Sequence, residues 1–124
     1  MNASSGYARM GGYADCRQEP QPFGSGAFAE YAVMPAKALA PKPPSLTFAE
    51  AATLPIAGLT ALQGLRDVGK IQAGQRVLIN GASGGVGAFA VQLAKAFGAE
   101  VTAVCSTRNV AQAQALGADQ VIDY

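Results

Sequence analysis

The chain has 124 residues, of which 50% are hydrophobic and 14% charged, and its formal net charge is +1. This length allows one domain with a sizeable core, and a nearly neutral chain without a basic stripe gives no reason to expect nucleic acid as a partner. The sequence has no histidine and only two cysteines, Cys16 and Cys105. We therefore expect no metal site, no disulfide framework and a reducing, cytoplasmic location.

The first part of the chain carries few signals of regular structure. Residues 1–23 are predicted to form an irregular leader, and they lack the basic start and apolar run of a signal peptide. Residues 24–46 predict a turn, a short strand over 27–33, a second possible strand over 38–40 and a proline-rich linker.

Helical signals follow over residues 47–68. The run from Thr47 to Glu50 fits a capping box, in which each side chain accepts a hydrogen bond from a free backbone N–H group. Pro55 is expected to break or kink this helix, so that a second helical stretch covers 55–68. Because Glu50 and Pro55 interrupt the apolar residues, no membrane span is expected here.

The segment 76–98 is typical of a strand, a glycine-rich turn and a helix. Residues 77–79 form a short apolar run with β-branched members, and residues 81–87 contain four glycines. Apolar side chains then recur at helical spacing and predict the buried face of the helix: Val86, Ala90, Leu93 and Phe97.

The glycine-rich turn predicts a site for a pyrophosphate group. Backbone N–H groups at a helix start have no partner inside the helix and lie at the positive end of its dipole. A phosphate can reach them only if Gly84 and Gly85 stay bare, while Gly87 allows close packing of the helix. The spacing departs from G-x-G-x-x-G, with Ala82 in the first place. The alternative is a tight turn without a ligand, and the strand and helix around it favour phosphate binding.

The remaining residues predict a strand over 101–105, a polar turn, a short helix over 110–116 and a strand from residue 120. The fold class is therefore α/β, with a β-α-β-α-β unit in strand order 3-2-1. This arrangement is half of a Rossmann doubly wound parallel sheet, preceded by a short strand, a linker and a helical segment. Residues 47–124 are expected to form a partial dinucleotide-binding domain.

The end of the second strand indicates which cofactor is bound. An NAD site usually has an Asp or Glu there, whereas this chain has Ser106, Thr107 and Arg108. Two hydroxyl groups and a guanidinium group favour the 2′-phosphate of NADP(H). The alternative for Arg108 is an ordinary solvated charge. A methyltransferase, which would also need an acidic residue at this point, is disfavoured.

Blocks of the sequence resemble the medium-chain dehydrogenase/reductase superfamily in the right order. They read GAFAEYAVMPAKALAPKP, AATLPIAGLTAL, AGQRVLINGASGGVGAFAVQLAKAFGAEVTAV, CSTRNV and LGADQVIDY, and they cover about residues 24–124. The closest resemblance is to the zinc-independent, NADPH-dependent quinone oxidoreductases, which are also similar to enoyl reductases. The resemblance implies hydride transfer from NADPH to a small molecule, a quinone or an α,β-unsaturated carbonyl compound.

The resemblance also implies roles for single residues. Thr60 corresponds to a threonine near the nicotinamide, and Tyr124 to an aromatic residue near the adenosine. The alternatives are a hydroxyl group bonded to its own helix for Thr60 and a frayed terminal residue for Tyr124. No catalytic residue is assigned. The cofactor-binding residues predicted in total are Thr60, Ala82, Ser83, Gly84, Gly85, Val86, Ser106, Thr107, Arg108 and Tyr124.

The chain departs from the family at both ends. Residues 1–23 do not resemble the family's substrate domain, residues 24–46 correspond to a remnant of that domain and its linker, and no second half of the cofactor domain follows Tyr124. We therefore expect a truncated NADPH-dependent oxidoreductase; the alternative is a non-catalytic module that binds a nucleotide or self-associates. Because strand 76–79 would keep one free edge, we expect a homo-oligomer, most simply a dimer; the alternative is that residues 1–33 fold back and supply the covering strand. No membrane partner is expected.

Overall fold

The structure is a computed structural model, and it describes residues 39–124. The expectations for residues 1–38, including the strand over 27–33, lie outside this range. The described residues fall into two units, 39–52 and 53–124, which are described separately. Among residues 39–124, no helix has both the length and the apolar character needed to cross a membrane.

In the first unit, the predicted capping box is present. The Thr47 backbone N–H donates to Glu50 Oε2 at 2.8 Å, and the Glu50 backbone N–H donates to Thr47 Oγ1 at 3.2 Å. Helix α1 (Phe48–Leu62) begins directly after Thr47, as a capping box requires. Residues 39 and 40, where a strand end was predicted, lie outside any strand.

The sequence predicts a break or a kink at Pro55, but helix α1 does not end there. Pro55 lies inside the helix, and the π-type helix η2 (Gln63–Val68) follows directly. A proline removes one backbone donor and crowds the preceding turn, but it leaves the other hydrogen bonds of the helix available. The predicted break at this residue is therefore wrong.

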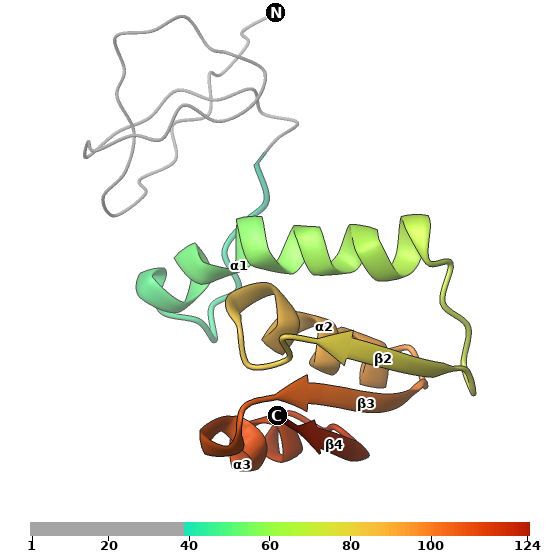
Figure 1. Cartoon of the computed structure of the whole chain (residues 1–124). Helices are drawn as coiled ribbons and strands as arrows, with labels where there is room; N and C mark the ends of the chain where they lie inside the picture. Colours follow the sequence, from blue (N-terminus) through green and yellow to red (C-terminus); the bar gives the residue numbers. More distant parts are fainter. Residues whose placement is uncertain (1–38) are drawn as a thin grey trace, which may run out of the picture. The chain divides into compact units, whose positions relative to one another are not determined.

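The second unit contains a three-stranded sheet in the order β2-β3-β4 (Figure 1). Its strands are β2 (Arg76–Asn80), β3 (Glu100–Cys105) and β4 (Gln120–Asp123). Both pairs of neighbouring strands are parallel. The predicted strand order, parallel direction and α/β class are thus confirmed.

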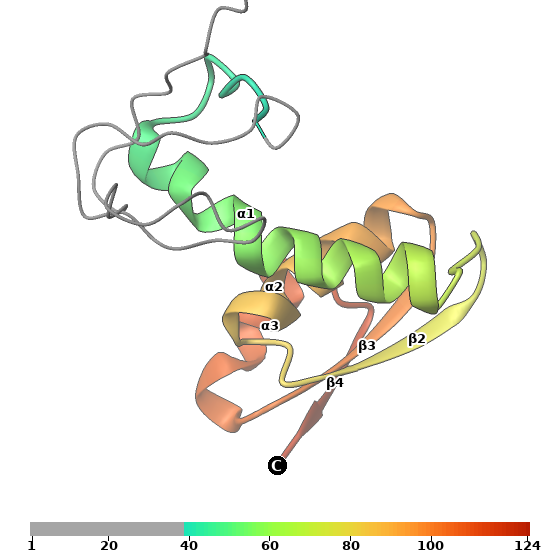
Figure 2. The ribbon, with the colours of Figure 1, turned by 90° about the horizontal axis from the view of Figure 1, so that it is seen from above.

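The strands are connected by helices, as a parallel sheet requires. Helix α2 (Gly85–Ala96) joins β2 to β3, and the 3-10 helix η3 (Thr107–Asn109) with helix α3 (Val110–Ala115) joins β3 to β4. Figure 1 shows the three strands side by side, and in Figure 2 the sheet is seen from above with β2 in front of the other strands. The predicted polar turn after β3 is therefore a single helical turn.

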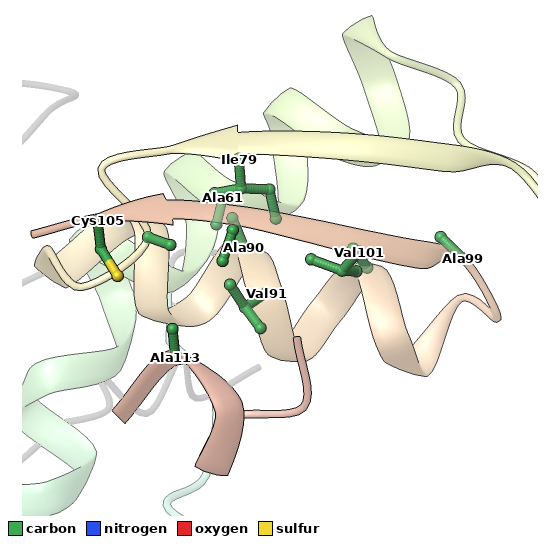
Figure 3. Close-up of a cluster of buried hydrophobic side chains, with 11 residues drawn as sticks. Ala61, Ile79, Ala90, Val91, Ala99, Val101, Cys105 and Ala113 are labelled. Atoms are coloured by element: carbon green, nitrogen blue, oxygen red, sulfur yellow. The ribbon is translucent and has the colours of Figure 1, made fainter. Parts of the chain in front are cut away.

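The core lies against one face of the sheet and is made of small side chains. Alternate residues of β3 point to this face, and Val101, Ala103 and Cys105 are almost completely buried. Figure 3 shows Val101 and Cys105 of this strand together with Ala90 and Val91 of α2. Since the contacting residues are mostly alanine and valine, helix and sheet can approach closely. Cys105 is a buried free thiol, as predicted.

The other face of the sheet is less covered. Leu78 of β2 is 62% exposed and Ile122 of β4 is 48% exposed, while Thr102 and Val104 between them are half-buried. The strand register places Leu78 beside Thr102 and Val104 beside Ile122. The second unit is therefore one sheet with its main core on a single side.

The predicted buried face of α2 is only partly correct. Ala90 is buried and Leu93 half-buried, but Val86 is 42% exposed. The fully buried positions are instead Val91 and Ala94. Val86 lies in the first turn of α2, beside the glycine-rich turn, where the helix start is exposed rather than covered by the sheet.

An ion pair ties α2 to the loop before β4. Lys95 Nζ lies 2.8 Å from Asp119 Oδ1, and Asp119 Oδ2 also accepts the Val101 backbone N–H at 2.6 Å. The hydrogen bond from Lys95, followed by that from Val101, holds the pKa of Asp119 below its usual value of 3.8. One carboxylate thus joins a helix, a strand and a loop.

This arrangement predicts a pH-dependent contribution to stability. Because the folded-state pKa of Asp119 is lowered, its contribution is present above the unfolded-state pKa near 3.8 and is lost as the pH falls through the folded-state value. Asp119→Asn should lower the thermal unfolding midpoint at pH 7 and reduce the loss of stability on acidification below pH 3.8. Thermal unfolding followed by circular dichroism across this pH range measures both effects.

Asp67→Asn provides the control. The pKa of Asp67 is also lowered, chiefly by a hydrogen bond from Arg66, but this exposed pair joins neighbours in the sequence and should contribute little. Equal effects of the two substitutions would contradict the prediction.

Candidate functional site

The candidate site is the edge of the sheet where all three strands end. Parallel strands have their carboxyl ends on the same edge, so the segments that follow them are neighbours. The turn 81–84 follows β2, Ser106 and η3 follow β3, and Tyr124 follows β4. Apart from Thr60, every predicted cofactor-binding residue lies in one of these segments or in the first turn of α2.

The glycine-rich turn is held against β3 by its backbone. Gly81 has a positive φ of 70°, a conformation that glycine adopts without strain. The backbone N–H groups of Gly81 and Ala82 both donate to the Val104 carbonyl oxygen, at 3.0 and 3.1 Å. Ala82 is completely buried, so it supports the turn, and its side chain is not available to a ligand.

The start of α2 offers free backbone donors. Within the described part of the chain, the N–H groups of Gly85 and Val86 have no acceptor, and both residues are exposed. The first hydrogen bond of the helix is from the Ala88 N–H to the Gly84 carbonyl oxygen, at 2.8 Å. Together with the positive end of the helix dipole, these donors provide a favourable place for an anion.

The three glycines at the helix start differ in the space around them. A Cβ atom on Gly85 would meet nothing within 4 Å, and one on Gly84 would lie 3.3 Å from the Gly81 carbonyl oxygen. A Cβ atom on Gly87 would lie 2.8 Å from Ala82 Cα and still nearer to the Gly81 oxygen. Gly87 is thus required by packing, as predicted, whereas packing does not explain the glycine at position 85.

The segment after β3 presents polar groups at the same edge. Thr107 and Arg108 are exposed, and Ser106 is half-buried. Thr107 Oγ1 donates to Asp123 Oδ1 at 3.0 Å, so its hydrogen is not free for a ligand. Arg108 forms no ion pair with any residue from 39 to 124. Its guanidinium group is therefore available to an anion.

Two residues of this edge were missed by the sequence analysis. Asp123, the last residue of β4, places a carboxylate next to Thr107. Asn109 Nδ2 donates to Ser83 Oγ at 3.0 Å and to Ser106 Oγ at 3.1 Å, which joins the glycine-rich turn to the segment after β3. Polar residues at the ends of strands are a general signal of a binding site. Which of these side chains pair depends on the register of the sheet, which the sequence does not give.

Thr60 and Tyr124 have different surroundings from the other predicted residues. Thr60 Oγ1 donates to the Ile56 carbonyl oxygen of its own helix at 2.7 Å, and no hydrogen bond joins it to the described residues of the strand edge. Tyr124 is 77% exposed, and its backbone N–H lies 3.4 Å from the Cys105 carbonyl oxygen. Their assignment to the cofactor stays a prediction.

Metal-binding side chains are sparse in the described range. Among residues 39–124, no group of three or more His, Cys, Asp or Glu side chains is arranged to hold a metal ion. The donors at the strand edge are backbone N–H groups, hydroxyl groups and one guanidinium group, which suit an anion rather than a cation.

Comparisons with known proteins point to the same family. A family model described as "Zinc-binding dehydrogenase" matches residues 85–124. The chain is 47% identical over 106 residues to a chloroplast envelope quinone oxidoreductase homolog of Arabidopsis thaliana, covering 82% of this chain and 32% of the relative. It is 47% identical over 107 residues to a mitochondrial NAD(P)H oxidoreductase of Mus musculus, covering 83% and 27%.

A solved structure agrees with these sequence matches. The CurK enoyl reductase superposes with a TM-score of 0.76 at 38% identity, covering 82% of this chain and 31% of that protein. The chain thus spans about a third of the length of the proteins that it matches. With the parallel sheet, the glycine-rich turn and these similarities, the chain belongs to the medium-chain dehydrogenase/reductase superfamily.

Proposed function

We propose that the chain is the cofactor-binding part of an NADPH-dependent oxidoreductase that transfers hydride to a quinone or an α,β-unsaturated carbonyl compound. The observation that carries the proposal is the exposed start of α2, where Gly85 and Val86 have free backbone donors and Gly85 has open space around its Cα atom. The names of the similar quinone oxidoreductase homolog and enoyl reductase support the class of substrate.

The pyrophosphate of the cofactor is proposed to lie against the helix start. Its oxygens would accept hydrogen bonds from the N–H groups of Gly85 and Val86, with Gly84 bare beside them. The negative charge would be stabilised by the helix dipole. A side chain at position 85 would occupy the space that the phosphate needs, which explains a glycine where packing does not demand one.

The adenosine end of the cofactor is proposed to lie over the ends of β3 and β4. Arg108 has a guanidinium group without an ion-pair partner among the described residues, and Ser106, two residues before it in the chain, has a hydroxyl group. These groups suit a 2′-phosphate, whereas Thr107 is bonded to Asp123 and contributes less. NADP(H) is therefore proposed over NAD(H).

The bound nicotinamide would supply the hydride for the reaction. The residues of this chain would then bind and orient the cofactor, and no acid or base among them is assigned to the chemistry. Thr60 is proposed near the nicotinamide and Tyr124 near the adenosine. The cytoplasmic location stays a prediction.

The alternative is a module that binds the nucleotide or self-associates without turnover. It would use the same helix start, so nucleotide binding alone does not separate it from an oxidoreductase. Oxidation of NADPH in the presence of a quinone does separate them, because only the oxidoreductase would consume the nucleotide.

Gly85→Val tests the proposed pyrophosphate site. The unmodified chain should quench or shift NADPH fluorescence in a titration, and Gly85→Val should abolish this binding because the branched side chain occupies the phosphate position. The circular dichroism spectrum should change little, since a Cβ atom at this position meets nothing within 4 Å.

Gly87→Ala is the matched control. It should destabilise the fold, because its Cβ atom would lie 2.8 Å from Ala82 Cα. Retained NADPH binding by a folded Gly85→Val protein would show that the turn serves packing only. Absence of NADPH binding by the unmodified protein would reject the proposed function.

Arg108→Ala tests the cofactor preference. A hydrogen bond to a charged group contributes about 1.5–3 kcal/mol, or roughly one to two decades in affinity. Arg108→Ala should weaken NADPH binding by this factor and leave NADH binding nearly unchanged, as measured by titration calorimetry. Arg108→Lys should retain part of the preference, because it keeps the charge but loses the planar fork. Equal losses for both nucleotides would contradict the assignment.

Self-association is proposed through β2. In the described part of the chain, β2 pairs on one side only, with β3, and an unpaired strand edge favours pairing with another chain. A second copy is the simplest partner, because two equal edges can pair about a two-fold axis. Light scattering at micromolar concentration should give a mass above 12.5 kDa; a single species at the mass of one chain would reject the homo-oligomer.

A further inference from the structure

Asn109 occupies a helix N-cap position without capping the helix. Asparagine is favoured at this position because its side-chain oxygen can accept a backbone N–H of the first turn. In α3, however, the Asn109 side chain makes no such bond. Its Nδ2 donates instead to Ser83 Oγ and Ser106 Oγ. The Asn109 side chain therefore serves another contact than a helix cap.

Both hydrogens of one amide nitrogen are used in these two bonds. Asn109, Ser83 and Ser106 are all half-buried, and the distances of 3.0 and 3.1 Å are those of ordinary hydrogen bonds. The two serines lie 23 positions apart in the chain, one in the turn after β2 and the other directly after β3. One side chain thus joins two segments of the strand edge that have no covalent connection nearby.

The direction of these bonds determines what the serines can do. A hydroxyl group has one hydrogen to donate and two lone pairs that accept. Since each Oγ accepts from Asn109, its hydrogen must be directed elsewhere. Among residues 39–124, neither hydroxyl hydrogen has an acceptor. Both serines therefore have a donor free for a ligand.

We propose that Asn109 is a positioning residue that makes Ser83 and Ser106 hydrogen-bond donors toward the phosphate groups of the cofactor. This inference rests on the proposed function. Ser83, in the glycine-rich turn, would donate to the pyrophosphate, and Ser106, two residues before Arg108, would donate to the 2′-phosphate. Asn109 itself has both N–H groups engaged and would not contact the cofactor with them.

The side-chain chemistry of asparagine suits this role. An aspartate of the same shape could bridge the two serines only by accepting from them. Their hydrogens would then be directed toward position 109, and their lone pairs would face the phosphates. A carboxylate would also add a negative charge beside two anionic groups. An amide nitrogen avoids both effects.

Affinities for NADPH and NADH, measured by calorimetry on the whole chain, test the inference. Ser83→Ala should weaken the binding of both nucleotides by a similar factor, whereas Ser106→Ala should weaken the binding of NADPH alone. Asn109→Ala should lower NADPH affinity about tenfold, as expected for one to two ordinary hydrogen bonds. Its effect on NADH should be smaller, because NADH has no 2′-phosphate.

The combined variants distinguish positioning from general destabilisation. In a Ser83→Ala/Ser106→Ala background, Asn109→Ala should change NADPH affinity by less than about twofold, because its partners are gone. Asn109→Asp should keep a thermal midpoint near that of the unmodified protein and bind NADPH no better than Asn109→Ala. Gln114→Ala, on an exposed position of α3, should change neither affinity nor midpoint.

Other outcomes are equally decisive. An undiminished effect of Asn109→Ala in the double-serine background would overturn the inference, because Asn109 would then act without the serines. The inference would also be overturned if Asn109→Asp bound NADPH as tightly as the unmodified protein does. If the unmodified chain bound neither nucleotide, the proposed function would be rejected, and this inference with it.

Discussion

The close approach of α2 to the glycine-rich turn is the constraint on which the rest of the candidate site depends. A Cβ atom on Gly87 would lie 2.8 Å from Ala82 Cα, so no other residue fits there without movement of the backbone. On its other side, the turn is fixed to β3 because the Val104 carbonyl oxygen accepts from both Gly81 and Ala82. The helix start is consequently held at the edge of the sheet, where the N–H groups of Gly85 and Val86 have no acceptor among residues 39–124.

The same geometry explains the composition of the core. A helix that begins so close to the strands can only pack on them through small side chains, and the buried residues are mainly alanines and valines. Val91 and Val101, completely buried, are among the largest of them. The small core leaves the other sheet face half-covered, with Leu78 and Ile122 exposed. The buried apolar side chains are thus concentrated on the sheet face that packs against α2 and so fix the position of the helix start.

Polar contacts divide the candidate site into groups that support the fold and groups available to a ligand. Thr107 is bonded to Asp123 and Asn109 to two serines, so these side chains connect neighbouring segments. Arg108 and the N–H groups of Gly85 and Val86 have no partner among residues 39–124. The available groups are donors or positively charged, which agrees with a proposed anionic ligand.

Local patterns in the sequence determined the elements of this protein, because they depend on near neighbours. The apolar run before residue 80, the glycines after it and the capping box at Thr47 predicted β2, the turn and the start of α1. The resemblance of ordered sequence blocks led to the superfamily. The break at Pro55 failed because one lost hydrogen bond does not end a helix whose other bonds remain.

Only the tertiary structure decided which side chains face one another. The exposure of Val86 and the burial of Val91 and Ala94 depend on how α2 is rotated against the sheet, which periodicity alone leaves uncertain. The bridge from Asn109 to Ser83 and the bond from Thr107 to Asp123 require the parallel register that brings separate strand ends together. Such contacts join residues far apart in the chain, and no local sequence pattern specifies them.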